Sequence, residues 1–182
     1  MPASISPSEF EQALRANFSA AHHLARWLTR TKADAEDALQ EAILRAFRSF
    51  DRLRPEKPRA WLLRIVRNCC YDLRKQQHAH DGEAILEDEA LPPDAGSPVL
   101  GMPAENPETR LLRMADARAL EEALRDVAPE YREVFLLREM EGLAYKEIAE
   151  VANIPVGTVM SRLSRARSKL RALIVARERE TA

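Results

Sequence analysis

The sequence has few of the residues that cross-link a small protein or build metal sites. Only two of its 182 residues are cysteines, and they are adjacent, at Cys69 and Cys70. Adjacent cysteines make an ordinary intramolecular disulfide implausible, and they leave no four-ligand zinc pattern. No apolar run approaches the ~18 to 20 residues that a membrane span needs, and the N-terminal segment lacks a signal-peptide pattern. We therefore expect a cytoplasmic protein without disulfides, metal ions or cofactors.

Catalytic motifs are also missing. The sequence contains no glycine-rich phosphate loop, no Gly-x-Ser-x-Gly, and no His/Cys/carboxylate set with metal-ligand spacing. His22 and His23 lie beside apolar residues, which favours packing or surface roles for both. We therefore predict that the protein is not an enzyme.

What the sequence does contain predicts helices. Hydrophobic residues make up 46% and charged residues 31%, which is typical of a folded protein. The net charge of −1 hides an asymmetry, since residues 1–80 carry +5, residues 81–109 carry −8 and residues 110–182 carry +2. Segment 81–109 also holds five of the eleven prolines and three of the five glycines, so it cannot form a long helix. We predict an all-α protein of two small helical bundles, 1–80 and 110–182, joined by a flexible acidic linker, 81–109.

The first bundle is expected to contain three helices. Ser6, Pro7 and Glu9 form a helix-start pattern in which Ser6 is the N-cap and Glu9 folds back onto it. Apolar spacing then predicts further helices at about 34–50 and 59–77. The apolar stripe of the first helix includes Phe10, Leu14, Phe18, Ala21, Leu24, Ala25 and Leu28.

One side of the third helix is basic and carries no acid. It gathers Arg64, Arg67, Asn68, Tyr71, Arg74 and Lys75. Trp61 and the preceding cations extend this side: Arg52, Arg54, Lys57 and Arg59. Cations with an aromatic ring and an amide suit the phosphates and base faces of a nucleic acid. A solvated helix face with a half-exposed tyrosine explains the composition equally well.

The second bundle is expected to end in a helix-turn-helix. Helices are predicted at about 108–127, 129–140, 145–152 and 155–177, with Gly142 as a helix stop and a short break at residues 153–155. The outward side of the last helix carries Thr158, Ser161, Arg162, Arg165 and Lys169, with Arg167 on its flank. Such a helix suits a major groove, where arginine can form bidentate bonds to guanine. The alternative is that these are ordinary solvent-exposed cations.

The second helix has a different surface. Its first turns are acidic, with Asp34 and Asp37, and Asp37 shares an outward face with Gln40, Glu41 and Leu44. Acids here are favourable against the helix dipole. The same face, with one sizeable apolar residue among polar ones, could instead bind a protein partner that carries complementary basic residues.

These motifs resemble the bacterial sigma factors. The segments that carry the resemblance are Asp34-Ala35-Glu36-Asp37-Ala38-Leu39-Gln40-Glu41 with Leu44-Arg45-Ala46-Phe47, residues 59–72, Tyr131-Arg132-Glu133-Val134-Phe135, residues 139–150 and residues 157–167. The segment from Asp34 to Phe47 is similar to the family's helix that binds core RNA polymerase, and residues 59–72 are similar to its promoter-melting helix. The three later segments are similar to its promoter-recognition domain. Asn153 stands where many helix-turn-helix turns carry glycine, and asparagine tolerates the left-handed conformation.

The short linker makes the chain similar to the minimal two-domain class, the extracytoplasmic-function (ECF) sigma factors of the sigma-seventy family. The resemblance implies core-polymerase binding by Asp34, Asp37, Gln40, Glu41 and Leu44. It implies that the basic side of the third helix, with the loop before it, melts and holds the minus-ten element, and that the last helix recognises the minus-thirty-five element as duplex. It also implies an inhibitory anti-sigma factor.

Two alternatives to a sigma factor stay open from the sequence. A one-component helix-turn-helix regulator would explain the last helix, and a sigma-like decoy that binds an anti-sigma factor would explain both bundles. The linker adds an expectation about promoter binding. A flexible coil of 29 residues averages about 30 Å end to end, whereas elements about 25 base pairs apart lie roughly 85 Å apart on B-DNA. We therefore predict that core polymerase must hold the linker extended before both elements can be bound.

Overall fold

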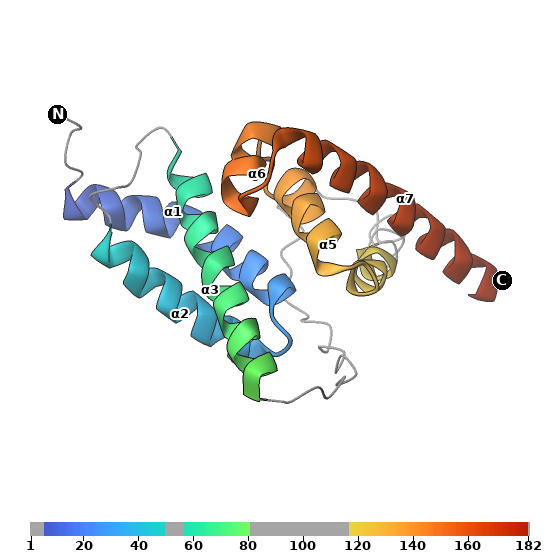
Figure 1. The fold of residues 1–182 in the computed structure, drawn as a ribbon, viewed down its shortest axis with the longest axis horizontal. Helices are drawn as coiled ribbons and strands as arrows, with labels where there is room; N and C mark the ends of the chain where they lie inside the picture. Colours follow the sequence, from blue (N-terminus) through green and yellow to red (C-terminus); the bar gives the residue numbers. More distant parts are fainter. Residues whose placement is uncertain (1–5, 50–56, 81–116, 182) are drawn as a thin grey trace, which may run out of the picture.

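The computed structural model describes residues 6–49, 57–80 and 117–181. Over these ranges the chain folds into helices without a strand, as the sequence predicts. Figure 1 shows two groups of helices packed side by side. None of the described helices is both long and apolar enough to cross a membrane. Arg52, Arg54 and the predicted linker lie outside the described residues.

Three helices form the N-terminal bundle: α1 (Pro7–Leu28), α2 (Lys32–Arg48) and α3 (Pro58–His80). The predicted start of α1 is confirmed, because Ser6 Oγ accepts from the Glu9 backbone N–H and Glu9 Oε2 accepts from the Ser6 backbone N–H at 2.8 Å. α2 begins before the predicted residue 34. Thr31 is its N-cap, and Asp34 completes a capping box with it, so Asp34 lies in the first turn, as the sequence predicts.

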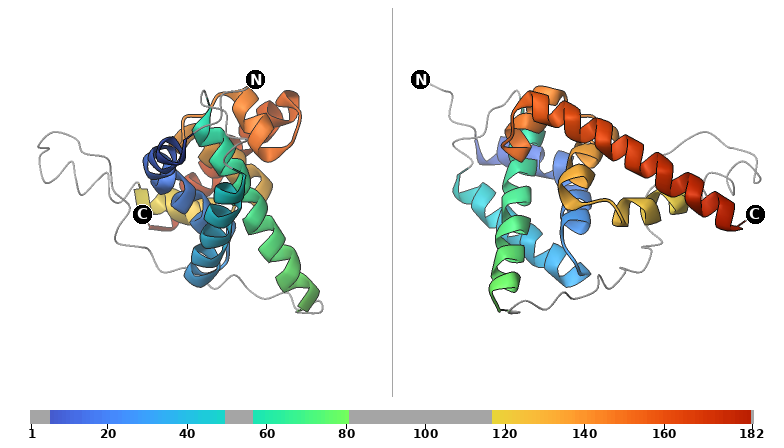
Figure 2. Two further views of the ribbon diagram at one scale, coloured as in Figure 1. Left: turned by 90° about the vertical axis from the view of Figure 1, so that its left-hand side faces the viewer. Right: turned by 45° about the vertical axis from the view of Figure 1, so that its right-hand side comes forward.

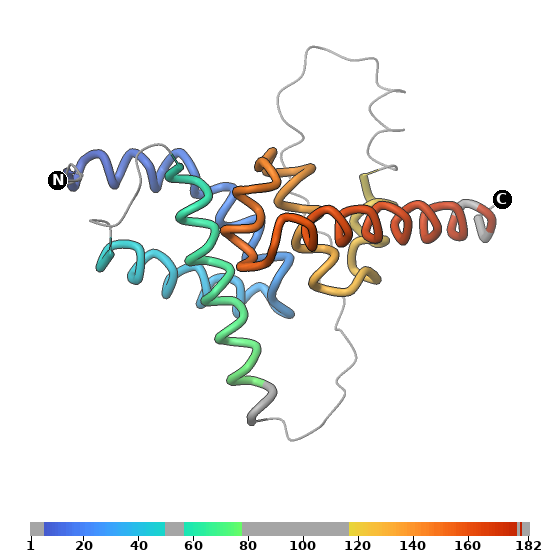
Figure 3. The backbone as a smooth tube through the Cα atoms, turned by 45° about the horizontal axis from the view of Figure 1, so that its top comes forward, coloured from blue at the N-terminus to red at the C-terminus, as the bar shows by residue number. Residues whose placement is uncertain are grey.

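The described part of the C-terminal bundle starts with helical residues 117–125. It continues with α5 (Pro129–Phe135), the π-helix η2 (Leu136–Met140), α6 (Tyr145–Ala152) and α7 (Val156–Thr181). Gly142, with φ of 66°, follows η2 as the predicted helix stop. Figure 3 shows α7 running from the side of α3 outward to the C-terminus.

The turn between α6 and α7 depends on Asn153. This exposed residue takes φ 53° and ψ 51°, the left-handed conformation that glycine and asparagine adopt most easily. It lets the chain reverse direction within the few residues that separate α6 from α7. The pair is therefore the helix-turn-helix that the sequence predicts.

Replacing Asn153 tests this turn. We expect Asn153→Val to lower the free energy of unfolding by roughly 1–2 kcal/mol, because a β-branched residue pays the full cost of the left-handed conformation. Asn153→Gly serves as the control and should keep the wild-type value within about 0.5 kcal/mol. Urea denaturation followed by circular dichroism measures both. Equal stability of the valine and glycine variants would contradict the role of this turn.

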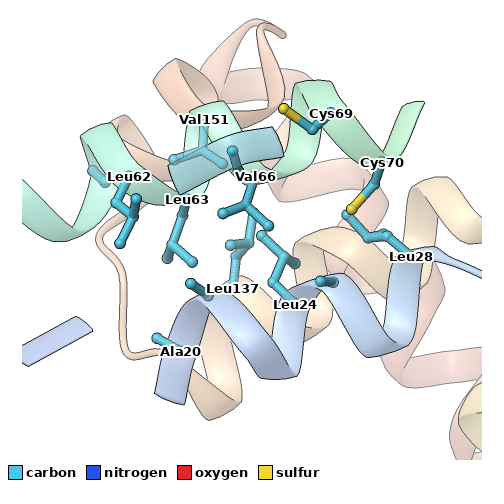
Figure 4. Close-up of a cluster of buried hydrophobic side chains, with 14 of the residues drawn as sticks. Ala20, Leu24, Leu28, Leu62, Leu63, Val66, Cys69, Cys70, Leu137 and Val151 are labelled. Carbon is cyan, nitrogen blue, oxygen red and sulfur yellow. The ribbon is translucent and has the colours of Figure 1, made fainter. Parts of the chain in front are cut away.

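The two bundles share one hydrophobic core. Buried residues of α1 and α3, such as Leu24, Leu63 and Val66, belong to the same cluster as Leu137 and Val151 of the C-terminal bundle, and Figure 4 shows these side chains converging. In both views of Figure 2, α6 lies beside the first half of α3. The linker is therefore not the only connection between the bundles, because α3 packs directly against α6.

Candidate nucleic-acid interface

α7 presents a polar stripe opposite its buried side. Its buried residues are Val159, Leu163, Ala166 and Leu170. On the other side Ser161 and Arg165 are exposed, and Thr158 and Arg162 are half-buried. The Ser161 hydroxyl donates to the Thr158 carbonyl at 3.0 Å, and Arg165 is exposed four residues further along the helix. Four of the six residues predicted to bind duplex DNA thus lie together near the N-terminus of α7.

The other two residues of that set contact their own bundle. Arg167 forms an ion pair with Glu139 of η2 at 2.6 Å, and Glu139 raises the pKa of Arg167. The Lys169 ammonium lies 4.9 Å from the centre of the Tyr131 ring, a cation–π distance. Both side chains contact other helices of the C-terminal bundle. The surface of α7 that is free to bind DNA therefore contains fewer residues than the sequence predicts.

Only part of the predicted protein-binding face on α2 is exposed. Asp37 and Gln40 are exposed, and Leu44 is 47% exposed beside them. Asp34 instead caps α2 and accepts from the Gln77 side chain of α3 at 2.7 Å. Glu41 pairs with Arg45, which also contacts Asp72, and these two acids raise the pKa of Arg45. Of the predicted protein-binding face, Asp37, Gln40 and Leu44 are therefore the residues that stay exposed without a hydrogen bond or ion pair to α3 or Arg45.

The basic side of α3 is exposed only in part. We use the term basic face of α3 for the described members of the predicted set: Lys57, Arg59, Trp61, Arg64, Arg67, Asn68, Tyr71, Arg74 and Lys75. Of these, Arg64, Asn68 and Lys75 are exposed and Arg74 is partly exposed. Trp61 lines a small apolar hollow with Phe10 and Leu14 of α1, so part of its ring packs against the N-terminal bundle.

Four other residues of the basic face contact acids of the C-terminal bundle. Arg67 and Tyr71 both donate to Glu133 of α5, the Tyr71 hydroxyl at 3.0 Å. Burial, with the nearby Glu133, raises the pKa of Tyr71 to about 12, so the phenol stays protonated as a donor. Arg59 pairs with Glu141, and Lys57 with Glu150 at 3.2 Å.

Sequence reasoning missed these carboxylates. Glu133 follows Arg132 and precedes the apolar run 134–137, and it is fully buried, while Glu141 is 8% exposed. Glu133 lies in a mixed charged and aromatic segment, so its sequence neighbours give no signal that it is buried or which distant cation it contacts.

The adjacent cysteines are core residues. Cys69 and Cys70 are both free and buried, and burial raises the pKa of the two thiols to about 11 and about 12. Both thiols are therefore protonated and unreactive at neutral pH. Within the described part of the chain, no group of three or more His, Cys, Asp or Glu side chains is arranged to hold a metal ion.

Comparison with known families matches both bundles. The family model for Sigma-70 region 2 matches residues 14–80, and the model for Sigma-70 region 4 matches residues 117–170. The chain is 33% identical to the ECF RNA polymerase sigma-E factor of Haemophilus influenzae over 149 residues, which cover 81% of this chain and 77% of that protein. The chain belongs to the sigma-70 family. Within that family it is an ECF sigma factor.

Further relatives in the ECF group come from mycobacteria. The ECF sigma factor SigM of Mycobacterium tuberculosis is 33% identical over 91% of this chain and 76% of its own length. The ECF sigma factor SigE of Mycolicibacterium smegmatis is 32% identical over 95% of this chain. The chain spans 64% of the length of that SigE protein.

Solved structures share the fold. The sigma factor RpoE of Bartonella quintana, in complex with the anti-sigma factor NepR, matches with a TM-score of 0.70 at 23% identity, over 91% of this chain and 96% of that one. CnrH, in complex with the cytosolic domain of CnrY, matches with a TM-score of 0.58 at 26% identity, over 92% of this chain and 88% of that one.

Proposed function

We propose that this ECF sigma factor binds core RNA polymerase in the cytoplasm and directs it to a class of promoters. The observation that carries the proposal is the helix-turn-helix of the region 4 match, whose α7 begins with an outward surface of hydroxyls and arginines and without a carboxylate. Anionic DNA favours such a surface, and arginine in a major groove supplies base discrimination.

The roles of the surfaces follow from their chemistry. Thr158, Ser161, Arg162 and Arg165 would contact the minus-thirty-five duplex. The basic face of α3 would hold the melted minus-ten strand, because its rings and cations suit stacked bases and phosphates. Asp37, Gln40 and Leu44 on α2 would bind core polymerase. The functional units would be residues 1–80 and 110–182, joined by the acidic segment 81–109.

An anti-sigma factor is the proposed regulatory partner. The solved RpoE structure from Bartonella quintana contains the anti-sigma factor NepR, and its fold is that of this chain. The basic face of α3 and the exposed part of α2 are the surfaces that such a partner would need to block.

Replacing Arg165 tests the role of α7 in promoter recognition. We expect Arg165→Ala to reduce run-off transcription by core polymerase at least about tenfold, because one bidentate base contact contributes roughly 1–3 kcal/mol. Arg179→Ala is the matched control, since Arg179 is exposed on the same helix near its C-terminus. The control should transcribe at the wild-type rate. Equal transcription by both variants would contradict the proposed recognition surface.

A further inference from the structure

The covered part of the basic face of α3 is organised around one buried carboxylate. Glu133 on α5 is fully buried, and its two oxygens accept from Arg67 and from Tyr71. The Arg67 side chain is only 17% exposed. Burying a carboxylate is costly unless it is paired and hydrogen-bonded. Glu133 therefore depends on α3 for the partners that let it stay ionised in the interior.

Two further carboxylates pair with cations toward the start of α3, and in these pairs the Lys57 and Arg59 side chains stay 37% and 42% exposed. Glu141, after η2, pairs with Arg59, and Glu150 on α6 pairs with Lys57 at 3.2 Å. Three acids of the C-terminal bundle thus meet three cations of the basic face. Carboxylate and phosphate oxygens are both anionic acceptors for arginine and lysine, so these acids occupy positions that a DNA strand would need.

Apolar contacts hold the same two surfaces together. Leu63 and Val66 of α3 lie in one buried cluster with Leu137 of η2 and Val151 of α6, as Figure 4 shows. The charged contacts therefore border a dry interface between the bundles. Nucleic acid cannot reach Arg67 or Tyr71 while this interface is closed.

We propose that the C-terminal bundle closes the basic face of α3 in the free protein, with Glu133 as the latch. DNA and Glu133 then compete for Arg67 and Tyr71. This inference rests on the proposed function of α3 in binding the melted strand. In the open protein Glu133 is in water and needs no partner, whereas in the closed protein its removal leaves Arg67 buried without a counter-charge. Loss of Glu133 therefore shifts the chain toward the open form.

The test measures closure and DNA binding separately in the full-length chain. Fluorescent dyes are attached at Glu36→Cys on α2 and Ser168→Cys on α7, both exposed sites, while the native cysteines are buried. Energy transfer between the dyes reports closure. Anisotropy of a labelled mixed-sequence single-stranded oligonucleotide reports binding to the basic face. Each measurement is made on the wild type and on Glu133→Ala.

Glu133→Ala is expected to lower energy transfer and to tighten oligonucleotide binding by about tenfold, because apparent affinity scales with the fraction of open protein. Glu133→Gln keeps the shape of the side chain without its charge, and it should change both signals in the same direction by less. Glu139→Ala is the matched control, since Glu139 pairs with Arg167 inside its own bundle. It should change neither signal.

The outcomes separate the latch from the proposed function. Unchanged energy transfer in both Glu133 variants, with wild-type helicity by circular dichroism, would overturn the latch. Lower energy transfer without tighter oligonucleotide binding would confirm the latch and overturn the role of α3 in DNA binding. If Glu133→Ala does not fold, the Glu133→Gln result alone decides between these outcomes.

Discussion

Replacing Leu44 with arginine is expected to weaken binding of the protein to core RNA polymerase by roughly thirtyfold or more, the size of an interface hot spot. Leu44 is 47% exposed and lies with Asp37 and Gln40 on the outward side of α2. An arginine at the centre of this face would bury a charge without a partner in the complex. Titration of labelled protein with core polymerase, followed by fluorescence anisotropy, measures the dissociation constant.

Phe18→Arg is the control for the Leu44 substitution. Phe18 lies on α1 of the same bundle and is 45% exposed, so the variant introduces the same charge at a similarly exposed apolar position. It should bind core polymerase with the wild-type affinity. If Leu44→Arg binds as tightly as Phe18→Arg, the proposed α2 interface is wrong.

Leu63→Ala is expected to lower the free energy of unfolding by about 2–5 kcal/mol, the range found when a buried leucine is truncated. Leu63 is fully buried in the cluster that contains residues of both bundles. Because the bundles share this core, both should unfold in one transition at a lower urea concentration. Leu44→Ala, which removes an exposed leucine, should change stability by less than about 0.5 kcal/mol.

Chemical denaturation shows whether the two bundles unfold together or separately. Far-ultraviolet circular dichroism reports the helices of both bundles. The fluorescence of Trp27 and Trp61 reports the N-terminal bundle and, through Trp27, its contact with a buried cluster of the C-terminal bundle. We expect the two signals to coincide in the wild type and in Leu63→Ala. A transition confined to the fluorescence signal would contradict the shared core.

Much of the local structure follows from the sequence because local interactions determine it. The capping box at Ser6, the helix stop at Gly142 and the left-handed turn at Asn153 each depend on residues a few positions apart. Sequence patterns can therefore predict these local interactions. The same reasoning placed Arg165 and Ser161 outward on α7, where the structure has them exposed.

Predictions of burial were less accurate at the edge of a helix stripe. Phe18 was expected in the core of the first bundle, and that expectation is wrong, because the residue is 45% exposed. It lies at the margin of the apolar side of α1, where the smaller Ala20 and Ala21 are buried instead. Periodicity gives the direction of a side chain, but the neighbouring helices decide how far the core extends.

Contacts between the bundles could not be predicted from the sequence. The sequence predicts a basic side of α3 that suits nucleic acid. In the structure Leu63 and Cys70 are also buried, and Arg67 and Tyr71 turn to Glu133. These contacts join residues more than 60 positions apart in the chain, and no local pattern encodes which distant surface covers a helix.

The closed arrangement gives a second reason for core polymerase to be needed at the promoter. The linker argument requires polymerase to hold the two bundles far enough apart to span both elements. Under the proposed latch, the bundles must also separate before Arg67 and Tyr71 of the basic face can meet DNA. Both arguments predict weak promoter binding by the isolated chain at physiological salt.

The most direct test of the central claim is transcription from fragmented genomic DNA of the source organism by core polymerase, with and without the purified chain, followed by sequencing of the RNA 5′ ends. We predict that the chain adds start sites that share one pair of upstream elements, at the minus-ten and minus-thirty-five positions. Start sites identical to those made by core polymerase alone would contradict the assignment of this chain as a promoter-directing sigma factor.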